Sequence, residues 1–133
     1  MPANFKPVFS LVPLTPFVVL TGTTTDKSGA TTANMKTLVT SGANGTKVTQ
    51  IGFKFVGTST AGTILIFITD TAGANPTLYD EIVYGAVTSS TTANSGRIFN
   101  LYSDLQLKSG QLIIVGATTV NTSINVWASQ GDF

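Results

Sequence analysis

The chain is 133 residues long, the size of a single domain, and 42% of its residues are hydrophobic, enough to build a core. Only 10% of the residues are charged and the net charge is +1, so the chain has no strong field for nucleic acid or anionic lipid. The sequence has no histidine and no cysteine, which excludes Ser-His-Asp and Cys-His catalysis, zinc sites with these ligands, and disulfides. We therefore expect no enzyme, cofactor or metal site, and neither nucleic acid nor membrane as a partner.

Residues 1–16 differ from the rest of the chain because prolines interrupt them at four positions. Proline disfavours both helix and regular sheet pairing, so the segment is predicted to be an extended arm. The arm packs either over the edge of its own domain or across a neighbouring subunit. Proline reduces the entropy lost on docking, and we expect docking in trans. The candidate interface residues are its large apolar side chains, Phe5, Val8, Phe9, Leu11, Val12 and Leu14.

Residues 17–133 are predicted to form an all-β domain, because β-branched residues are abundant and turn-forming Gly and Asn separate short apolar runs. About eight antiparallel strands favour a jelly-roll-like β-sandwich, with an immunoglobulin-like sandwich as the second option. The predicted strands are Phe17–Thr21, Met35–Thr40, Thr46–Val56, Thr63–Thr69, Leu78–Tyr84, Arg97–Ser103, Gln111–Ala117 and Ser123–Ala128.

Three strands differ in how their faces are patterned. In 51–55 the apolar residues alternate with Gly52 and Lys54, which is typical of a strand with one face in water. Residues 64–68 and 112–115 are apolar on both faces. Because a two-layer sandwich has one dry face per sheet, a loop, the arm or another chain must cover the second face of these two strands.

Trp127 is the remaining candidate interface residue. In the predicted strand 123–128, Ile124 and Val126 share one face, and Trp127 lies with Asn125 on the other. A Trp on the polar face of a strand can anchor an interface. The alternative is that a loop of the same domain covers Trp127.

The carboxylates do not form a catalytic pair. Glycoside hydrolysis needs two carboxylates that flank one bond, whereas Asp80 and Glu81 are adjacent in a predicted strand and must point to opposite faces. Asp70 opens a Gly-rich turn that lacks the ligand spacing of a calcium loop. We expect Asp70 to cap that turn with its own side chain.

From about residue 41 onward, short turn-and-strand pieces resemble small virion proteins of tailed bacteriophages and prophages, of the auxiliary-capsid or head-decoration type. The pieces are Asn44-Gly45-Thr46 leading into Val48 and Ile51, Gly57-Thr58 with Thr60-Ala61-Gly62-Thr63, Leu78-Tyr79-Asp80-Glu81-Ile82, Leu107-Lys108-Ser109-Gly110, and Ala128 through Gly131-Asp132-Phe133.

The resemblance implies a structural protein that binds and stabilises a capsid shell. Its partners would be the major capsid protein and other copies of the same chain, since such proteins often form homotrimers. It would be made in the cytoplasm of the bacterial host and act on the capsid surface. An alternative is a tail- or fibre-associated module that binds a receptor or glycan, and a bacterial carbohydrate-binding domain is a third option.

Overall fold

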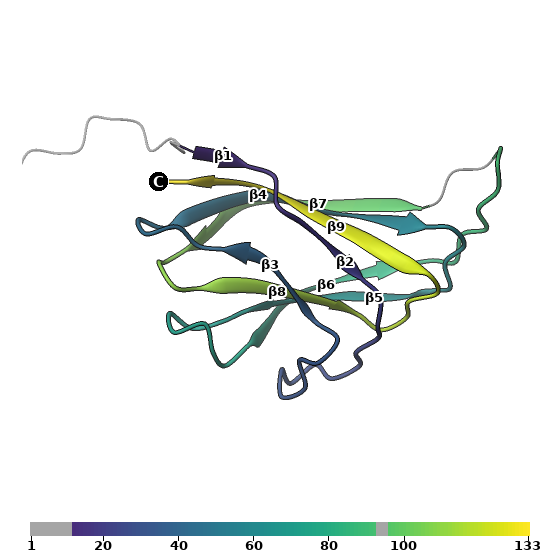
Figure 1. The fold of residues 1–133 in the computed structure, drawn as a ribbon, viewed down its shortest axis with the longest axis horizontal. Helices are drawn as coiled ribbons and strands as arrows, with labels where there is room; N and C mark the ends of the chain where they lie inside the picture. Colours follow the sequence, from purple (N-terminus) through teal and green to yellow (C-terminus); the bar gives the residue numbers. More distant parts are fainter. Residues whose placement is uncertain (1–11, 93–95) are drawn as a thin grey trace, which may run out of the picture.

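The computed structural model describes residues 12–92 and 96–133, and every regular element within them is a β-strand (Figure 1). The described part of the chain is therefore all-β, as the composition predicts. The strands are β1 (Val12–Leu14), β2 (Phe17–Leu20), β3 (Lys36–Thr40), β4 (Thr46–Val56), β5 (Gly62–Ile68), β6 (Thr77–Tyr84), β7 (Arg97–Leu107), β8 (Leu112–Ala117) and β9 (Ser123–Asp132).

The strands form two antiparallel sheets that pack face to face as a β-sandwich (Figure 1). In the first, here called sheet A, β9 lies between β4 and the N-terminal strands β1 and β2, and β7 forms the opposite edge. In sheet B the order is β3-β8-β5-β6. The predicted sandwich is confirmed, and β4 has the predicted bounds.

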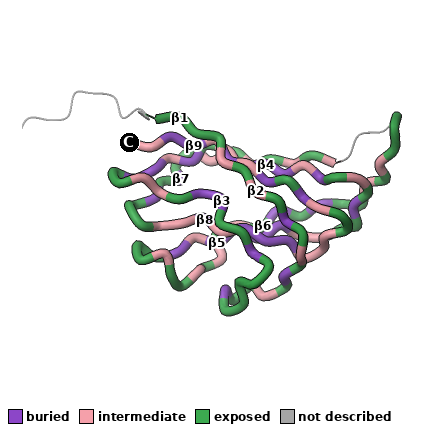
Figure 2. Tube along the Cα trace, in the orientation of Figure 1, coloured by how far each residue is buried: buried purple, intermediate pink, exposed green. Residues whose placement is uncertain are grey.

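The core lies between the sheets and consists of the inward-facing residues of both (Figure 2). In β4 the side chains of Ile51, Phe53 and Phe55 are buried against the other sheet, and Lys54 lies on the opposite face with partial exposure. This is the predicted alternation. Burying one such side chain is worth about 1.5–3 kcal/mol, so this one strand is a substantial part of the driving force for folding.

Strand β1 differs from the prediction of an arm whose prolines keep it out of regular sheet pairing. Val12, Pro13 and Leu14 pair with Asp132, Gly131 and Gln130 at the end of β9. Proline is acceptable there because β1 is an edge strand, where one side of the backbone needs no partner. Val12 and Leu14 nevertheless remain 50% and 43% exposed. This part of the predicted arm is thus paired with its own sheet.

The remaining predicted arm residues, Phe5, Val8, Phe9 and Leu11, lie outside the described residues.

A loop of the same chain covers the second apolar face of β5. Leu65 and Phe67 are fully buried on the outer side of sheet B, where they form a second small core with Met35. Met35 ends the segment 21–35, here called the covering loop. The loop is fixed by a backbone hydrogen bond from Thr24 to the Ala117 carbonyl (2.9 Å) and by an ion pair on β6. The sequence left a loop, the arm or another chain as the cover of this second apolar face, and for β5 the cover is the loop.

Candidate functional site

The outer face of sheet A carries a row of aromatic side chains that crosses four strands. Phe17 on β2 lies opposite Trp127 on β9, Trp127 lies opposite Gly52 on β4, and Gly52 lies opposite Phe99 on β7. Residues directly opposite each other in antiparallel strands point to the same face and touch through their side chains. The register therefore gathers three aromatic rings from distant parts of the sequence onto one surface.

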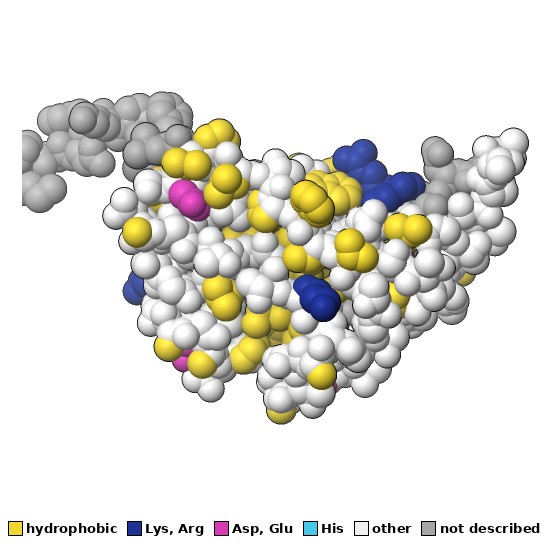
Figure 3. Space-filling view, viewed as in Figure 1, with side chains coloured by type: hydrophobic (Ala, Val, Ile, Leu, Met, Phe, Trp, Pro, Cys, Tyr) yellow, Lys and Arg dark blue, Asp and Glu magenta, His cyan; other side chains and the backbone are white. Residues whose placement is uncertain are grey.

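Much of this row is open to solvent. Phe17 is 75% exposed and Phe99 is 49% exposed, and on β7 the next outward residue, Leu101, is 74% exposed. Figure 3 shows hydrophobic side chains over the β1 and β2 edge, close to a group of Lys and Arg side chains. We call the following set the outer-face patch: Phe17, Val19, Arg97, Phe99, Leu101 and Trp127.

Gly52 sets the position of the Trp127 indole. A Cβ atom at Gly52 would lie 2.2, 2.5 and 2.7 Å from three consecutive ring atoms of Trp127, namely Cζ2, Cε2 and Cη2. Because these distances are similar, the face of the indole rather than its edge covers the glycine. A glycine inside a strand marks a place where another group approaches the backbone closely. Here that group is Trp127, whose other face is directed away from the sheet.

Arg97 lies above two of the rings. Its guanidinium carbon is 5.2 Å from the centre of the Trp127 ring and 5.8 Å from the centre of the Phe99 ring. Both distances are within the range of a cation–π contact. In the described part of the chain no carboxylate pairs with Arg97, since the ion pair there joins Lys27 and Glu81.

The charges next to the aromatic row have one sign. Lys54 lies opposite Arg97 in the ladder between β4 and β7, which places two cations beside the aromatic row. Asp104 lies on the outer face too, but at the opposite end of β7 from Arg97. The other acidic side chains lie elsewhere: Asp26 and Asp70 bond within loops, Asp132 bonds to Thr46, Glu81 bonds to the covering loop, and Asp80 lies on β6. The patch is therefore apolar with a positive border.

The predicted interface residues that the structure describes lie in two different places. Trp127 lies on the outer face with partial exposure, within the aromatic row. Val12 and Leu14 lie in β1 opposite Asp132 and Gln130, at the edge of the sheet and outside the row.

The predicted interface residues do not include Phe17, Arg97, Phe99 and Leu101, which the structure adds to the row. The period-2 spacing of Arg97, Phe99 and Leu101 in a predicted strand is a signal that could have placed these three on one face.

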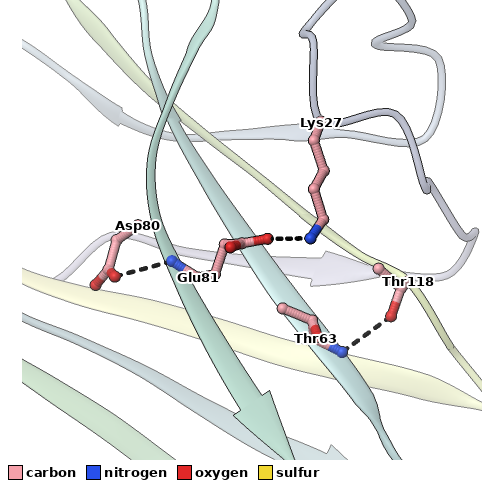
Figure 4. A network of polar contacts seen from close by, with 5 residues as sticks. All are labelled: Lys27, Thr63, Asp80, Glu81 and Thr118. Atoms are coloured by element: carbon pink, nitrogen blue, oxygen red, sulfur yellow. Dashed lines mark hydrogen bonds and ion pairs between the residues drawn. The ribbon is translucent and has the colours of Figure 1, made fainter.

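Asp80 and Glu81 point to opposite faces of β6, as predicted (Figure 4). The Glu81 carboxylate pairs with Lys27 of the covering loop at 2.6 Å. The Asp80 carboxylate turns toward sheet A, where it accepts hydrogen bonds from the Tyr102 hydroxyl (2.8 Å) and the Asn100 amide (3.2 Å). The two carboxylates therefore hold structural contacts on different sides of the strand.

We expect stability to be independent of pH between about pH 6 and 8, because no ordinary side-chain pKa of this composition lies there. Hydrogen bonds from Ser28 and Thr31 lower the pKa of Asp26 to about 2, and those from Ala74 and Asn75 lower the pKa of Asp70. Both groups bond more strongly when ionised. Their contribution is present above about pH 4 and is lost as the pH falls through the lowered pKa.

At high pH the tyrosines have the opposite effect, so that stability is lost as the pH rises. Burial raises the pKa of Tyr102, and the hydrogen bond to Asp80 raises it further; burial also raises the pKa of Tyr84. Their neutral forms are favoured in the folded state, so this stability is complete below about pH 10 and is lost above it. Thermal melting measured from pH 2 to 11 checks both limits. A steep change near neutrality would contradict the expectation.

Gly52→Ala is expected to displace the Trp127 indole while the sandwich stays folded. The added Cβ would overlap the ring, and the ring is the end of a side chain on the outer face, so it can rotate outward. We expect a red-shifted Trp fluorescence spectrum with unchanged far-UV circular dichroism. Gly85→Ala is the control, since its Cβ would meet no atom within 4 Å. An unchanged emission spectrum in Gly52→Ala would show that the indole does not rest on the glycine.

No protein-family model and no curated protein matches the chain. Across residues 12–92 and 96–133 there is no group of three His, Cys, Asp or Glu side chains that could hold a metal ion. In the same residues there is no helix long and apolar enough to cross a membrane.

Proposed function

We propose that the chain is a non-enzymatic structural protein of a tailed-bacteriophage particle, an auxiliary protein of the decoration or cement type. It is made in the cytoplasm of the bacterial host and binds the major capsid protein on the surface of the shell. The observation that carries the proposal is the outer-face patch, a solvent-exposed set of aromatic and aliphatic side chains on one face of the sandwich.

The composition of the patch favours a protein partner. Interface centres are enriched in Trp, Phe and Arg and depleted of acidic residues, and Trp and Arg are frequent hot spots. The patch has both of these residues in contact, with Phe17 and Phe99 on either side. A continuous exposed apolar surface is uncommon on an isolated soluble protein and marks an interaction site.

The strand pairing supports a jelly roll as the finer description of the sandwich. The pairs β2–β9, β3–β8, β4–β7 and β5–β6 are those of one long antiparallel ribbon folded back on itself. Eight-stranded jelly rolls of this kind are common in viral capsid proteins. The fold alone does not carry the function, but it agrees with the resemblance of residues 41–133 to phage virion proteins.

The mechanism would be stabilisation by mass action. A protein that binds the assembled shell and not its free subunits lowers the free energy of the shell by its binding free energy. Sites where several capsid subunits meet would allow one copy to hold two or more of them. Self-association, with a homotrimer as the expected form, would multiply the contacts for each copy bound.

The second candidate is a tail- or fibre-associated module that binds a glycan receptor. One observation favours it: polar side chains border the aromatic row, with Asn125 and Lys54 in the row on one side and Gln50 and Ser129 in the row on the other. Rings that stack on a sugar, with amides and hydroxyls beside them, could provide both contact area and hydrogen bonds.

Electron microscopy of purified particles labelled with an antibody to the chain tests the location. Label on the head supports the decoration function, label at the tail tip supports the receptor module, and particles without label contradict both. Binding to shells that lack the chain then tests the patch. Leu101→Ala should weaken binding about tenfold, whereas Val83→Ala, a comparably exposed residue on sheet B, should not.

A further inference from the structure

We propose that Arg97 is the recognition residue of the outer-face patch and that it binds a carboxylate presented by an apolar protein surface. The proposed function supplies the natural partner, the capsid shell. The chemistry of recognition comes from the geometry around Arg97 and can be tested without the shell.

The guanidinium of Arg97 is held in place while its donors stay available. It lies over the rings of Trp127 and Phe99, and no carboxylate in the described part of the chain pairs with it. A stacked guanidinium keeps its planar set of N–H donors directed outward, in a shape that matches the two oxygens of a carboxylate. Because stacking restricts the side chain before binding, less entropy is lost when the carboxylate arrives.

The surroundings make this pair stronger than an ordinary surface ion pair. Phe99 and Trp127 lie beside the arginine, and Phe17 and Leu101 extend the apolar surface on the same face, so an apolar partner that covers this surface would exclude water from the ion pair. Exclusion of water strengthens the attraction between the charges, and apolar contacts that keep water away from a polar contact are typical of hot spots.

Charge complementarity disfavours a pair of identical copies centred on Arg97. Such a pair would bring Arg97 and Lys54 of one copy next to the same two cations of the other, because the carboxylate on this face, Asp104, lies at the far end of β7. Like charges at an interface cost several kcal/mol and suppress that pairing. An occupant centred on Arg97 therefore has to supply negative charge.

The aliphatic part of the patch favours a protein over an acidic sugar. Leu101 is 74% exposed and Val19 is 43% exposed, and neither side chain can bond to a hydroxyl group. A sugar covering them would leave hydroxyls without partners, which costs binding free energy. Apolar side chains of a protein fit the same positions without that cost.

The test is a nuclear magnetic resonance titration of the ¹⁵N-labelled full chain with defined probes. The first probe is the peptide N-acetyl-Leu-Asp-Phe amide, the second its Asn isostere, and the third methyl glucuronide, which carries a carboxylate on a sugar. We expect the Asp peptide to shift the Trp127 indole and Gly52 amide signals. Binding should be at least about tenfold weaker for the Asn peptide.

Two variants distinguish the specific effect of the Arg97 guanidinium from the effect of positive charge in general. Arg97→Lys keeps the charge but loses the planar donor set, and it should reduce binding of the Asp peptide by about tenfold. Lys36→Gln removes an exposed cation from sheet B and should have no effect. The amide spectra of both variants show that they are folded.

Several outcomes would overturn the inference: no shift with the Asp peptide, equal binding of the Asp and Asn peptides, or equal binding by Arg97→Lys. Binding of the glucuronide in place of the peptide would also overturn it, by assigning the patch to acidic glycans. If the Asp peptide binds as expected but the chain does not bind shells, the proposed function is wrong and the role of Arg97 stands.

Discussion

Phe53→Ala is expected to lower the free energy of unfolding by about 3–5 kcal/mol. Phe53 is in the centre of β4 and has no exposed surface, so its loss leaves a cavity between the two sheets. Since domains of this size are stable by about 5–15 kcal/mol, the change removes a large share of the total. Chemical denaturation followed by circular dichroism measures it.

Phe99→Ala is the matched control, because it removes the same side chain from the neighbouring strand on the other face. Phe99 is 49% exposed, and its loss should cost less than about 1 kcal/mol. Under the proposed function the two variants have opposite effects on the folded protein: Phe99→Ala weakens shell binding, and folded Phe53→Ala binds normally. A large loss of stability in Phe99→Ala would mean that the outer face belongs to the core.

Gly116→Ala is expected to destabilise the domain by about 1–3 kcal/mol through the covering loop. A Cβ at Gly116 would lie 2.4 Å from Cγ2 of Thr24 and 3.2 Å from Cγ of Met35. Both side chains are buried, and the backbone of Thr24 is bonded to Ala117, so the loop has to move away from sheet B. That movement exposes Leu65 and Phe67 to water.

Two measurements check the effect of Gly116→Ala. Thermal melting should fall relative to the wild type, and binding of a hydrophobic dye should rise as the small core opens. The same substitution at Gly85, where the new methyl group meets no atom within 4 Å, should leave both unchanged. A stable Gly116→Ala variant without dye binding would show that the loop adjusts without losing its contact with the sheet.

The sequence predicts the strands well where hydrophobic residues alternate with polar ones. β4 has the predicted bounds. A shift of its register by one residue would turn the inward-facing Ile51, Phe53 and Phe55 from the core to the solvent. The predicted ends of β7 and β9 are too early, at Ser103 and Ala128 rather than Leu107 and Asp132. The residues added to β9 are polar or glycine, whereas two of the four added to β7 are leucines, and pairing with β4 extends both strands.

Tertiary contacts decide the features that local sequence could not predict. Pro13 argues against a strand, yet β1 forms because β9 offers an open edge. The apolar pattern of β5 requires a cover but does not identify it, since the covering loop is rich in Thr and has no large apolar residue besides Met35. The spacing of Trp127 predicts its position on an outer face, but its contacts with Gly52 and Arg97 depend on pairings between distant strands.

The central position of β9 has a consequence for the order in which the domain can fold during translation. β9 pairs with β4 on one side and with β1 and β2 on the other, and it leaves the ribosome after every other strand described. Until then sheet A lacks its middle strand, and β2, near the start of the chain, has no partner within that sheet. Contacts between residues so far apart in the sequence, such as Leu20 and Ile124, form slowly. The chain between them loses conformational entropy before the contacts can compensate for that loss. Sheet B, whose strands are all synthesised by Ala117, can assemble earlier and serve as the template on which sheet A is completed.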